Sequence, residues 1–210
     1  MPKNQDGARS RPTQKRAQES VDKLVEAATR VLAEFGYEGA STNRIAEYAD
    51  VGIATLYRYF KDKDDLVDAV FQRQVADTEA LASGVIVSAL NDTLDGALRT
   101  ILRTAVETME RNAPLYRVFT GGASRHMKAP DHFLATTQSR LLTMGRIAVM
   151  HILGLPDGPQ TDAIAFLGAA ATSSLAITIA LERPPELDRD ELIDHGVRML
   201  ALWLASYSPP

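Results

Sequence analysis

The sequence of 210 residues contains no cysteine. This absence excludes a disulfide framework and every site built on thiolate ligands, such as a structural zinc or iron–sulfur centre. The N-terminal stretch MPKNQDGARSRPTQKRAQES is basic and polar, and it lacks the apolar run of a secretory signal. We therefore expect the protein to stay in the reducing cytoplasm.

Signatures of catalysis and of metal binding are also lacking. The sequence has no HExxH-type motif, and the spacing of His126 and His132 does not place both on one face of a helix. No nucleophile and base occur together in a catalytic pattern. The sequence therefore predicts no enzyme, no cofactor and no metal site.

Long hydrophobic runs are scarce, and one segment needs a closer look. Residues 163–181 carry no charge, but Ala, Gly, Ser and Thr make them only mildly hydrophobic. No second run of this kind and no flanking basic cluster accompanies them, so we predict no membrane span. Because this segment is apolar nearly all round, we expect a helix that is buried on most sides.

The alternation of apolar and polar residues that marks a half-buried strand is missing too. Hydrophobic residues make up 45% and charged residues 24% of the chain, which is ordinary for a folded globular protein. Apolar residues recur instead at helical spacing in one segment after another. We predict an all-α fold.

Charge is unevenly distributed along the chain. Residues 1–63 contain 11 Lys and Arg against 9 Asp and Glu, which gives a net charge of +2, and the remaining residues carry −6. The basic end is thus the candidate for contacting phosphates. Within it, residues 1–15 have no periodicity and are expected to form a flexible arm.

Short helices separated by tight turns are predicted in the next part of the chain. Together they match a helix-turn-helix head at residues 16–68, with the motif itself at residues 41–60. Its predicted elements are a helix from Arg16 closed by Gly36, a second capped by Ser41 or Thr42, a turn at Asp50-Val51-Gly52, a third at residues 53–60, and a fourth capped by Asp62.

Longer helices follow in residues 69–210, which we expect to form a helical body. Helix signals start near Asn91 or Asp92 and stop before Pro114, and a breaker cluster, GLPDGP, ends a later helix. The predicted body helices are residues 91–113, 114–127, 131–153, 163–181 and 190–206.

The third short helix has the features of a DNA-reading helix. Eight residues span about 12 Å at 1.5 Å per residue, which suits a major groove about 12 Å wide. Leu56 and Phe60 are four apart and would face the other helices. Two tyrosines, an arginine and a threonine then remain outward, where they can reach base edges and phosphate oxygens.

The run IAEYADVGIATLYRYFKDKDDL resembles the DNA-binding domain of the TetR family of bacterial regulators. The resemblance lies in Ile45-Ala46, Thr55-Leu56-Tyr57, Phe60, Lys63 and Leu66 at their mutual spacing. It implies double-stranded operator DNA as a partner. The DNA contacts that it implies are Thr42, Arg44, Ile53, Ala54, Thr55, Tyr57, Arg58, Tyr59 and Lys63.

Two positions depart from the family pattern, in which the turn commonly reads Ala-Gly-Val-Ser. Asp50 stands where glycine is usual and must adopt the turn conformation, which Asp tolerates better than most residues. Gly52 replaces the serine that would cap the next helix. Cap strength and one phosphate anchor are therefore expected to be reduced.

The resemblance also implies a small-molecule effector in the body and a homodimer formed by the last two long helices, residues 163–181 and 190–206. A repressor released from its operator by the effector is the function expected. The alternatives are a helical carrier or sensor with a degenerate head, and a helical enzyme. The candidate pocket residues are Phe119, Arg125, His126, Met127, Met144, His151 and Trp203.

Overall fold

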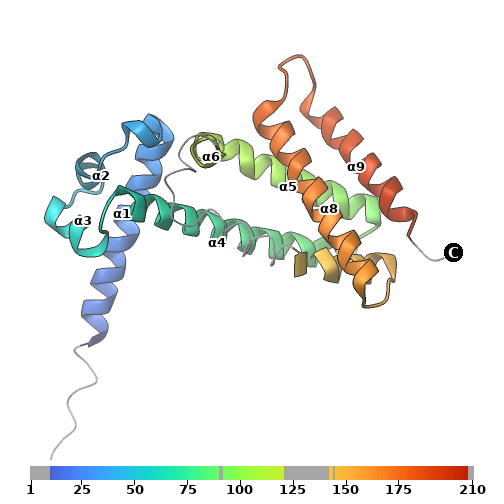
Figure 1. Ribbon diagram of the computed structural model, residues 1–210, viewed down its shortest axis with the longest axis horizontal. Helices are drawn as coiled ribbons and strands as arrows, with labels where there is room; N and C mark the ends of the chain where they lie inside the picture. The colour runs from blue at the N-terminus through green and yellow to red at the C-terminus, as the bar shows by residue number, and fades with distance from the viewer. Residues whose placement is uncertain (1–9, 90–91, 121–141, 144, 208–210) are drawn as a thin grey trace, which may run out of the picture. The chain divides into compact units, whose positions relative to one another are not determined.

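The computed structural model describes residues 10–89, 92–120, 142–143 and 145–207. Every regular element in these residues is helical, which confirms the all-α prediction (Figure 1). The chain forms two compact units. The first comprises Met1–Arg73 and Arg117–Lys128, and the second comprises Gln74–Tyr116 and Ala129–Pro210.

The first helix, α1, spans Ser10–Gly39 and begins earlier than the periodicity predicts. Residues 10–15, which we expected in the flexible arm, belong to this helix. Pro12 lies in the first turn, where the missing N–H breaks no helical bond. Gly36 interrupts the helix with a φ of 68°, as predicted for the residue that closes it.

Local capping explains the two short helices that follow. Helix α2, Thr42–Tyr48, begins at Ser41, whose hydroxyl accepts a hydrogen bond from the Arg44 N–H at 3.3 Å. Helix α3, Ile53–Tyr59, begins at Gly52 and has no side-chain cap. Both cap predictions are therefore confirmed, including the weak start of α3.

The turn between α2 and α3 depends on a left-handed residue. Asp50 has a φ of 53°, and it is the one residue other than glycine with a positive φ among those described. Val51 then donates its N–H to the Ala46 carbonyl at 3.0 Å, which closes the turn. Asp50 thus adopts the conformation that glycine holds in the family pattern.

Substitution at Asp50 should reveal this strain. We expect Asp50→Ala to destabilise the α2–α3 segment by about 1 kcal/mol relative to Asp50→Gly, because the alanine Cβ crowds the following carbonyl oxygen in the left-handed conformation and glycine has no Cβ. Hydrogen exchange of the α2 and α3 amides in the two variants measures the difference. Equal protection in the alanine and glycine variants would contradict this account of the turn.

Helix α4, Lys63–Ala89, starts at a second well-capped end. The Asp62 carboxylate accepts from the Asp65 N–H at 2.9 Å, and Asp65 in turn accepts from the Lys61 N–H at 3.0 Å. Leu66, Val67 and Val70 of this helix are buried in the first unit. The cap thereby fixes the entry into α4 directly after the α3 segment.

The second unit is a helical body with its core between three helices. Helices α5, Leu94–Arg111, α8, Pro159–Ile177, and α9, Arg189–Ala205, pack on one another, and a π-helical segment, Thr178–Glu182, extends α8 (Figure 1). The residues of the core include Leu102, Val106, Ile193, Val197 and Leu200.

Several body boundaries differ from the predicted ones. Thr93, rather than Asn91 or Asp92, caps α5, because its hydroxyl accepts from the Gly96 N–H at 3.2 Å. Helix α6 spans Ala113–Thr120, and residues 121–127 of the predicted helix lie outside the described residues. Residues 145–153 are helical and end before Gly154, as the breaker cluster predicts.

The expected burial of α8 on most sides is wrong for the single chain. Phe166 and Leu167 are 53% and 54% exposed, on a stripe of α8 that faces away from the core. On α9, Met199 and Leu202 are exposed in the same way, at 53% and 70%. We call these four residues the α8–α9 apolar face.

Among the described helices, α8 with its extension to Glu182 is the one long and apolar enough to cross a membrane, by length and composition alone. Its inner side packs against α5 and α9, which accounts for part of its apolar character. The rest of its apolar surface belongs to the α8–α9 apolar face. A protein partner could cover that face just as lipid could.

Candidate nucleic-acid interface

Helix α3 presents one side to the first unit and the other to solvent. Leu56 and Phe60, on the inner side, are 0% and 8% exposed, and α3 packs on α2, in which Ile45 and Ala46 are buried. The outer side carries Tyr57, which is 54% exposed, together with exposed Ile53, Ala54 and Arg58. Thr55 and Tyr59 are half-buried at its borders.

A side-chain contact joins this outer side to the start of α2. The Thr42 and Tyr57 hydroxyl oxygens lie 3.1 Å apart, within hydrogen-bond distance. Both residues are predicted DNA contacts. Their contact holds the Tyr57 ring in one orientation and places two hydroxyls side by side, so that a phosphate oxygen could accept from one and a base edge could meet the other.

The Arg44 side chain does not point toward the exposed side of α3. Its guanidinium donates to the Gly39 carbonyl and lies 4.2 Å from the centre of the Phe35 ring. The Phe35 ring in turn meets Tyr48 edge to face. Arg44 therefore fastens α2 to the end of α1, and the structure does not bring its charge together with the exposed side of α3.

Lys63 also makes contacts within the first unit that the sequence did not predict. Its ammonium donates to the Tyr37 carbonyl at 3.0 Å and lies 3.8 Å from the centre of the Tyr37 ring. The Tyr37 hydroxyl donates to Asp64 at 2.6 Å, and burial together with this carboxylate raises the Tyr37 pKa well above its usual value. An ammonium has three N–H donors, so this bond still leaves Lys63 capable of reaching a phosphate.

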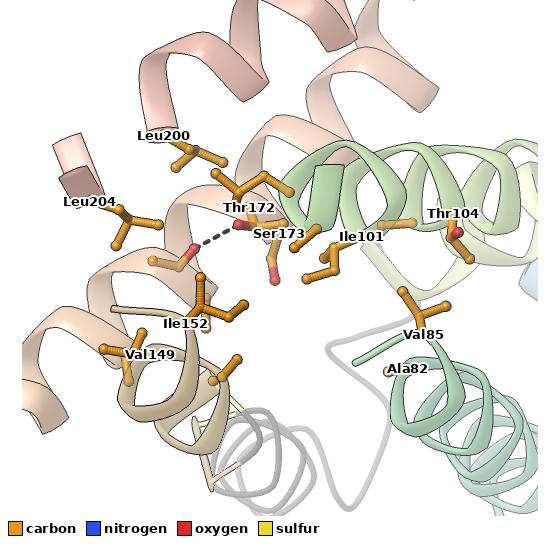
Figure 2. A pocket seen from close by; sticks show the side chains of 18 of the residues that line it. Ala82, Val85, Ile101, Thr104, Val149, Ile152, Thr172, Ser173, Leu200 and Leu204 are labelled. Carbon is orange, nitrogen blue, oxygen red and sulfur yellow. Dashed lines mark hydrogen bonds between the residues drawn. The ribbon is translucent and has the colours of Figure 1, made fainter. Parts of the chain in front are cut away.

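A cavity of about 230 Å³ lies in the second unit. Its walls come from α4, α5, α6, residues 145–153, α8 and α9. Figure 2 shows Ile101 and Thr104 facing the same space as Thr172 and Ser173. The lining is almost entirely apolar, with alanines and glycines where larger side chains would fill the space. Such a cavity suits a small apolar ligand.

None of the three described pocket candidates lines this cavity. Phe119 packs edge to face on Phe71 with ring centres 4.6 Å apart, His151 is exposed, and Trp203 packs on Tyr207. The other four candidates, Arg125, His126, Met127 and Met144, lie outside the described residues. Within the described parts of the chain, no group of three or more metal-ligating side chains occurs.

Comparison with known proteins places the head in a defined family. A family model described as bacterial regulatory proteins, tetR family, matches residues 24–70, from the buried stripe of α1 to Val70 of α4. An HTH-type transcriptional regulator of Staphylococcus aureus strain USA300 is 44% identical over 61 residues, which are 29% of this chain and 33% of that protein. The matched stretch thus spans about a third of the curated relatives.

Solved structures match over nearly the whole chain. A TetR-family transcriptional regulator from Mesorhizobium loti is 20% identical and covers 92% of this chain and 99% of its own, with a TM-score of 0.72. Another from Pectobacterium atrosepticum is 22% identical and covers 93% and 97%, with a TM-score of 0.67. At such identities the likeness shows that the fold is shared.

Residues 24–70 are thus similar to the tetR family of bacterial regulatory proteins, and the described chain shares the fold of TetR-family structures. Its helix-turn-helix matches the DNA-binding domain of that family, and α3 occupies the position of the helix that such a motif directs to the major groove. The TetR pattern carries no comparable information for the body, whose cavity depends on which small residues meet in space. The predicted pocket residues include large aromatic and polar side chains, whereas the cavity is lined by small residues such as Ala82, Ala105 and Gly168.

Proposed function

We propose that this chain is a sequence-specific transcriptional repressor of the TetR family that acts in the cytoplasm as a homodimer and leaves its operator when a small molecule binds the body. The observation that carries the proposal is the exposed side of α3. It presents Tyr57, Arg58 and small Ala54 on a helix whose inner residues are fully anchored.

The roles of the exposed residues follow from their chemistry. Ala54 allows a close approach to the bases, and the Arg58 guanidinium can bind a guanine edge. Thr55 can meet a base or a phosphate oxygen, while Ile53 can contact a thymine methyl group. Tyr59 and the phosphate-binding groups, Thr42, Tyr57 and Lys63, would fix the register on the backbone.

The α8–α9 apolar face supports the homodimer. Its four large side chains are each more than half exposed in the single chain, which is unusual for neighbouring apolar residues of a soluble protein. A two-fold pairing of α8 and α9 would bury them in a four-helix bundle. The dimer would present two α3 helices to successive major grooves, whose half-sites are about 34 to 36 Å apart.

The cavity supports the effector part of the proposal. Six segments of the body meet around it, so a ligand that binds there contacts α8 and α9, which would also form the dimer interface. If ligand binding changes the separation of the two heads, they can no longer bind both half-sites at the same time, and the affinity for the operator falls. A carrier or sensor with a degenerate head is the competing function, and DNA binding separates the two.

Binding to the DNA upstream of the protein's own gene tests the proposal. We expect a specific complex whose affinity falls steeply with salt, because Lys and Arg displace counterions from phosphates. Tyr59→Phe and Lys63→Ala should weaken binding to all sequences. Lys63→Ala should also lower the salt slope by about one for each phosphate that the lysine no longer neutralises.

Lys61→Ala is the matched control for Lys63→Ala, because Lys61 is exposed and lies two residues earlier. If Lys63 binds a phosphate, the control should change the salt slope less than Lys63→Ala does. Fluorescence anisotropy over a series of salt concentrations provides the measurement. Salt-insensitive binding, or binding equal for all sequences, would favour the carrier with a degenerate head.

A further inference from the structure

The cavity of the second unit has a specific chemical character. All of its described lining residues are uncharged, and the polar ones carry only hydroxyl groups. Figure 2 shows two of these hydroxyl residues, Thr104 on α5 and Ser173 on α8, facing the space that Ala82 and Val85 of α4 border. The polar residues of the lining are Thr78, Thr104, Thr108, Tyr116, Thr172 and Ser173.

Three of these hydroxyls already have partners in their own helices. Thr78 donates to the Gln74 carbonyl at 2.7 Å, Thr108 donates to the Thr104 carbonyl at 2.7 Å, and Thr172 donates to the Gly168 carbonyl at 2.8 Å. The Thr104 and Ser173 hydroxyls form no hydrogen bond with any residue that the structure describes. The Thr104 and Ser173 hydroxyls are therefore available to a ligand.

One described cation, Arg111, contacts a lining residue but does not itself line the cavity. Arg111, at the end of α5, is exposed and donates from its guanidinium to the Thr108 hydroxyl at 3.3 Å. Its charge is thus solvated. A carboxylate or ammonium group deep in the cavity would lose its hydration without gaining an opposite charge among the described residues, which strongly disfavours binding.

Volume sets the size of the ligand. An engineered cavity of roughly 150 Å³ accepts benzene, which has six carbon atoms. By the same scale, the cavity of about 230 Å³ accommodates on the order of ten non-hydrogen atoms. That is the size of a substituted monocyclic compound or a medium-chain alcohol, and it is far smaller than an acyl-coenzyme A.

We propose that the ligand of this cavity is an uncharged, largely apolar molecule of about ten non-hydrogen atoms that carries one hydroxyl or carbonyl group, which Ser173 binds. This inference rests on the proposed function, because it specifies the effector of the same cavity. It excludes fatty carboxylates and organic cations as effectors.

Four probes with one common skeleton test the ligand class in the full-length protein. They are 4-propylphenol, propylbenzene, 4-propylbenzoate and 4-propylbenzylamine, titrated by isothermal calorimetry at neutral pH. We expect 4-propylphenol to bind at least tenfold more tightly than either charged probe. Ala82→Phe, which adds a ring to the cavity wall, should abolish binding of all four.

Ser173→Ala tests the hydrogen bond itself. We expect a three- to tenfold loss of affinity for 4-propylphenol and a change of less than twofold for propylbenzene, which has no polar group to lose. Ser174→Ala, at the exposed neighbouring position on α8, should change neither affinity. Equal losses for the phenol and for propylbenzene would overturn the role of Ser173.

The possible failures are distinguishable. Equal or tighter binding of 4-propylbenzoate would overturn the ligand class and leave the effector function standing. Loss of that binding in Arg111→Gln would assign it to the cation beside Thr108. If none of the probes binds, both the ligand class and this cavity's role as effector site are contradicted, while DNA binding is measured independently of them.

Discussion

Arg58→Ala is expected to lower operator affinity by about 2 to 6 kcal/mol, because a dimer loses the interaction in both half-sites and each base contact contributes about 1 to 3 kcal/mol. Arg58 is exposed on the outer side of α3, so the substitution should leave the fold intact. Anisotropy titrations of operator and scrambled DNA at one salt concentration measure both affinities. The loss should be larger for the operator.

Arg30→Ala is the matched control for Arg58→Ala. Arg30 is an exposed arginine of the same unit and pairs with Glu26 within α1, away from the side of α3 that faces solvent. Its removal should change operator affinity by less than twofold. Equal losses in both variants would mean that Arg58 contributes only general charge, and an unchanged operator affinity in Arg58→Ala would refute its role at the bases.

Leu202→Asp should convert the protein to monomers. Leu202 is 70% exposed in the single chain and belongs to the α8–α9 apolar face. Burial of a leucine side chain contributes about 1.5 to 3 kcal/mol, and a two-fold interface contains the residue twice. Sedimentation at micromolar concentration should therefore show monomers, and operator affinity should fall more than 100-fold because a single head binds one half-site.

Leu187→Asp is the matched control for Leu202→Asp, because it also replaces an exposed leucine by aspartate. Leu187 is also an exposed leucine, at 44%, but it lies between the π-helical segment and α9, away from the α8–α9 apolar face. This variant should remain a dimer with normal operator affinity. A dimeric Leu202→Asp protein would exclude the α8–α9 apolar face as the dimer interface.

The head could be predicted from the sequence because its geometry depends on local signals. Gly36 ends a helix by its positive φ, Ser41 and Asp62 cap the helices that follow them, and Leu56 lies one turn from Phe60. Each of these signals acts within a few residues. The resulting placement of α3 therefore follows from patterns that a single sequence carries.

The inward turn of Arg44 and the bond from Lys63 to Tyr37 could not be predicted in the same way. The ammonium of Lys63 meets a carbonyl 26 residues earlier, and the guanidinium of Arg44 has a ring of α1 within reach. Both contacts depend on how α1, α2 and α4 pack. Charge and position along the chain identify these residues as basic, but not whether the charge faces DNA.

The body is harder to predict from the sequence than the head, for a physical reason. A cavity arises where side-chain volume is missing, so the residues that create it, such as Ala82, Ala97 and Ala148, have the same pattern as ordinary helix-packing positions. The aromatic candidates Phe119 and Trp203 pack on other rings instead. The apolar composition of α8 does not by itself tell whether the helix is covered by its own chain or by a partner, and only the resemblance to the TetR family suggested a dimer partner for it.

Selection of bound sequences from a library of random duplex DNA tests the central claim most directly. An exposed α3 in each half of a dimer predicts enrichment of an inverted repeat, whose half-sites are centred about one helical turn or a multiple of it apart. Arg58→Ala should relax the preference at one position of each half-site. Recovery of no preferred sequence, or of a single half-site by the dimeric wild-type protein, would contradict the account.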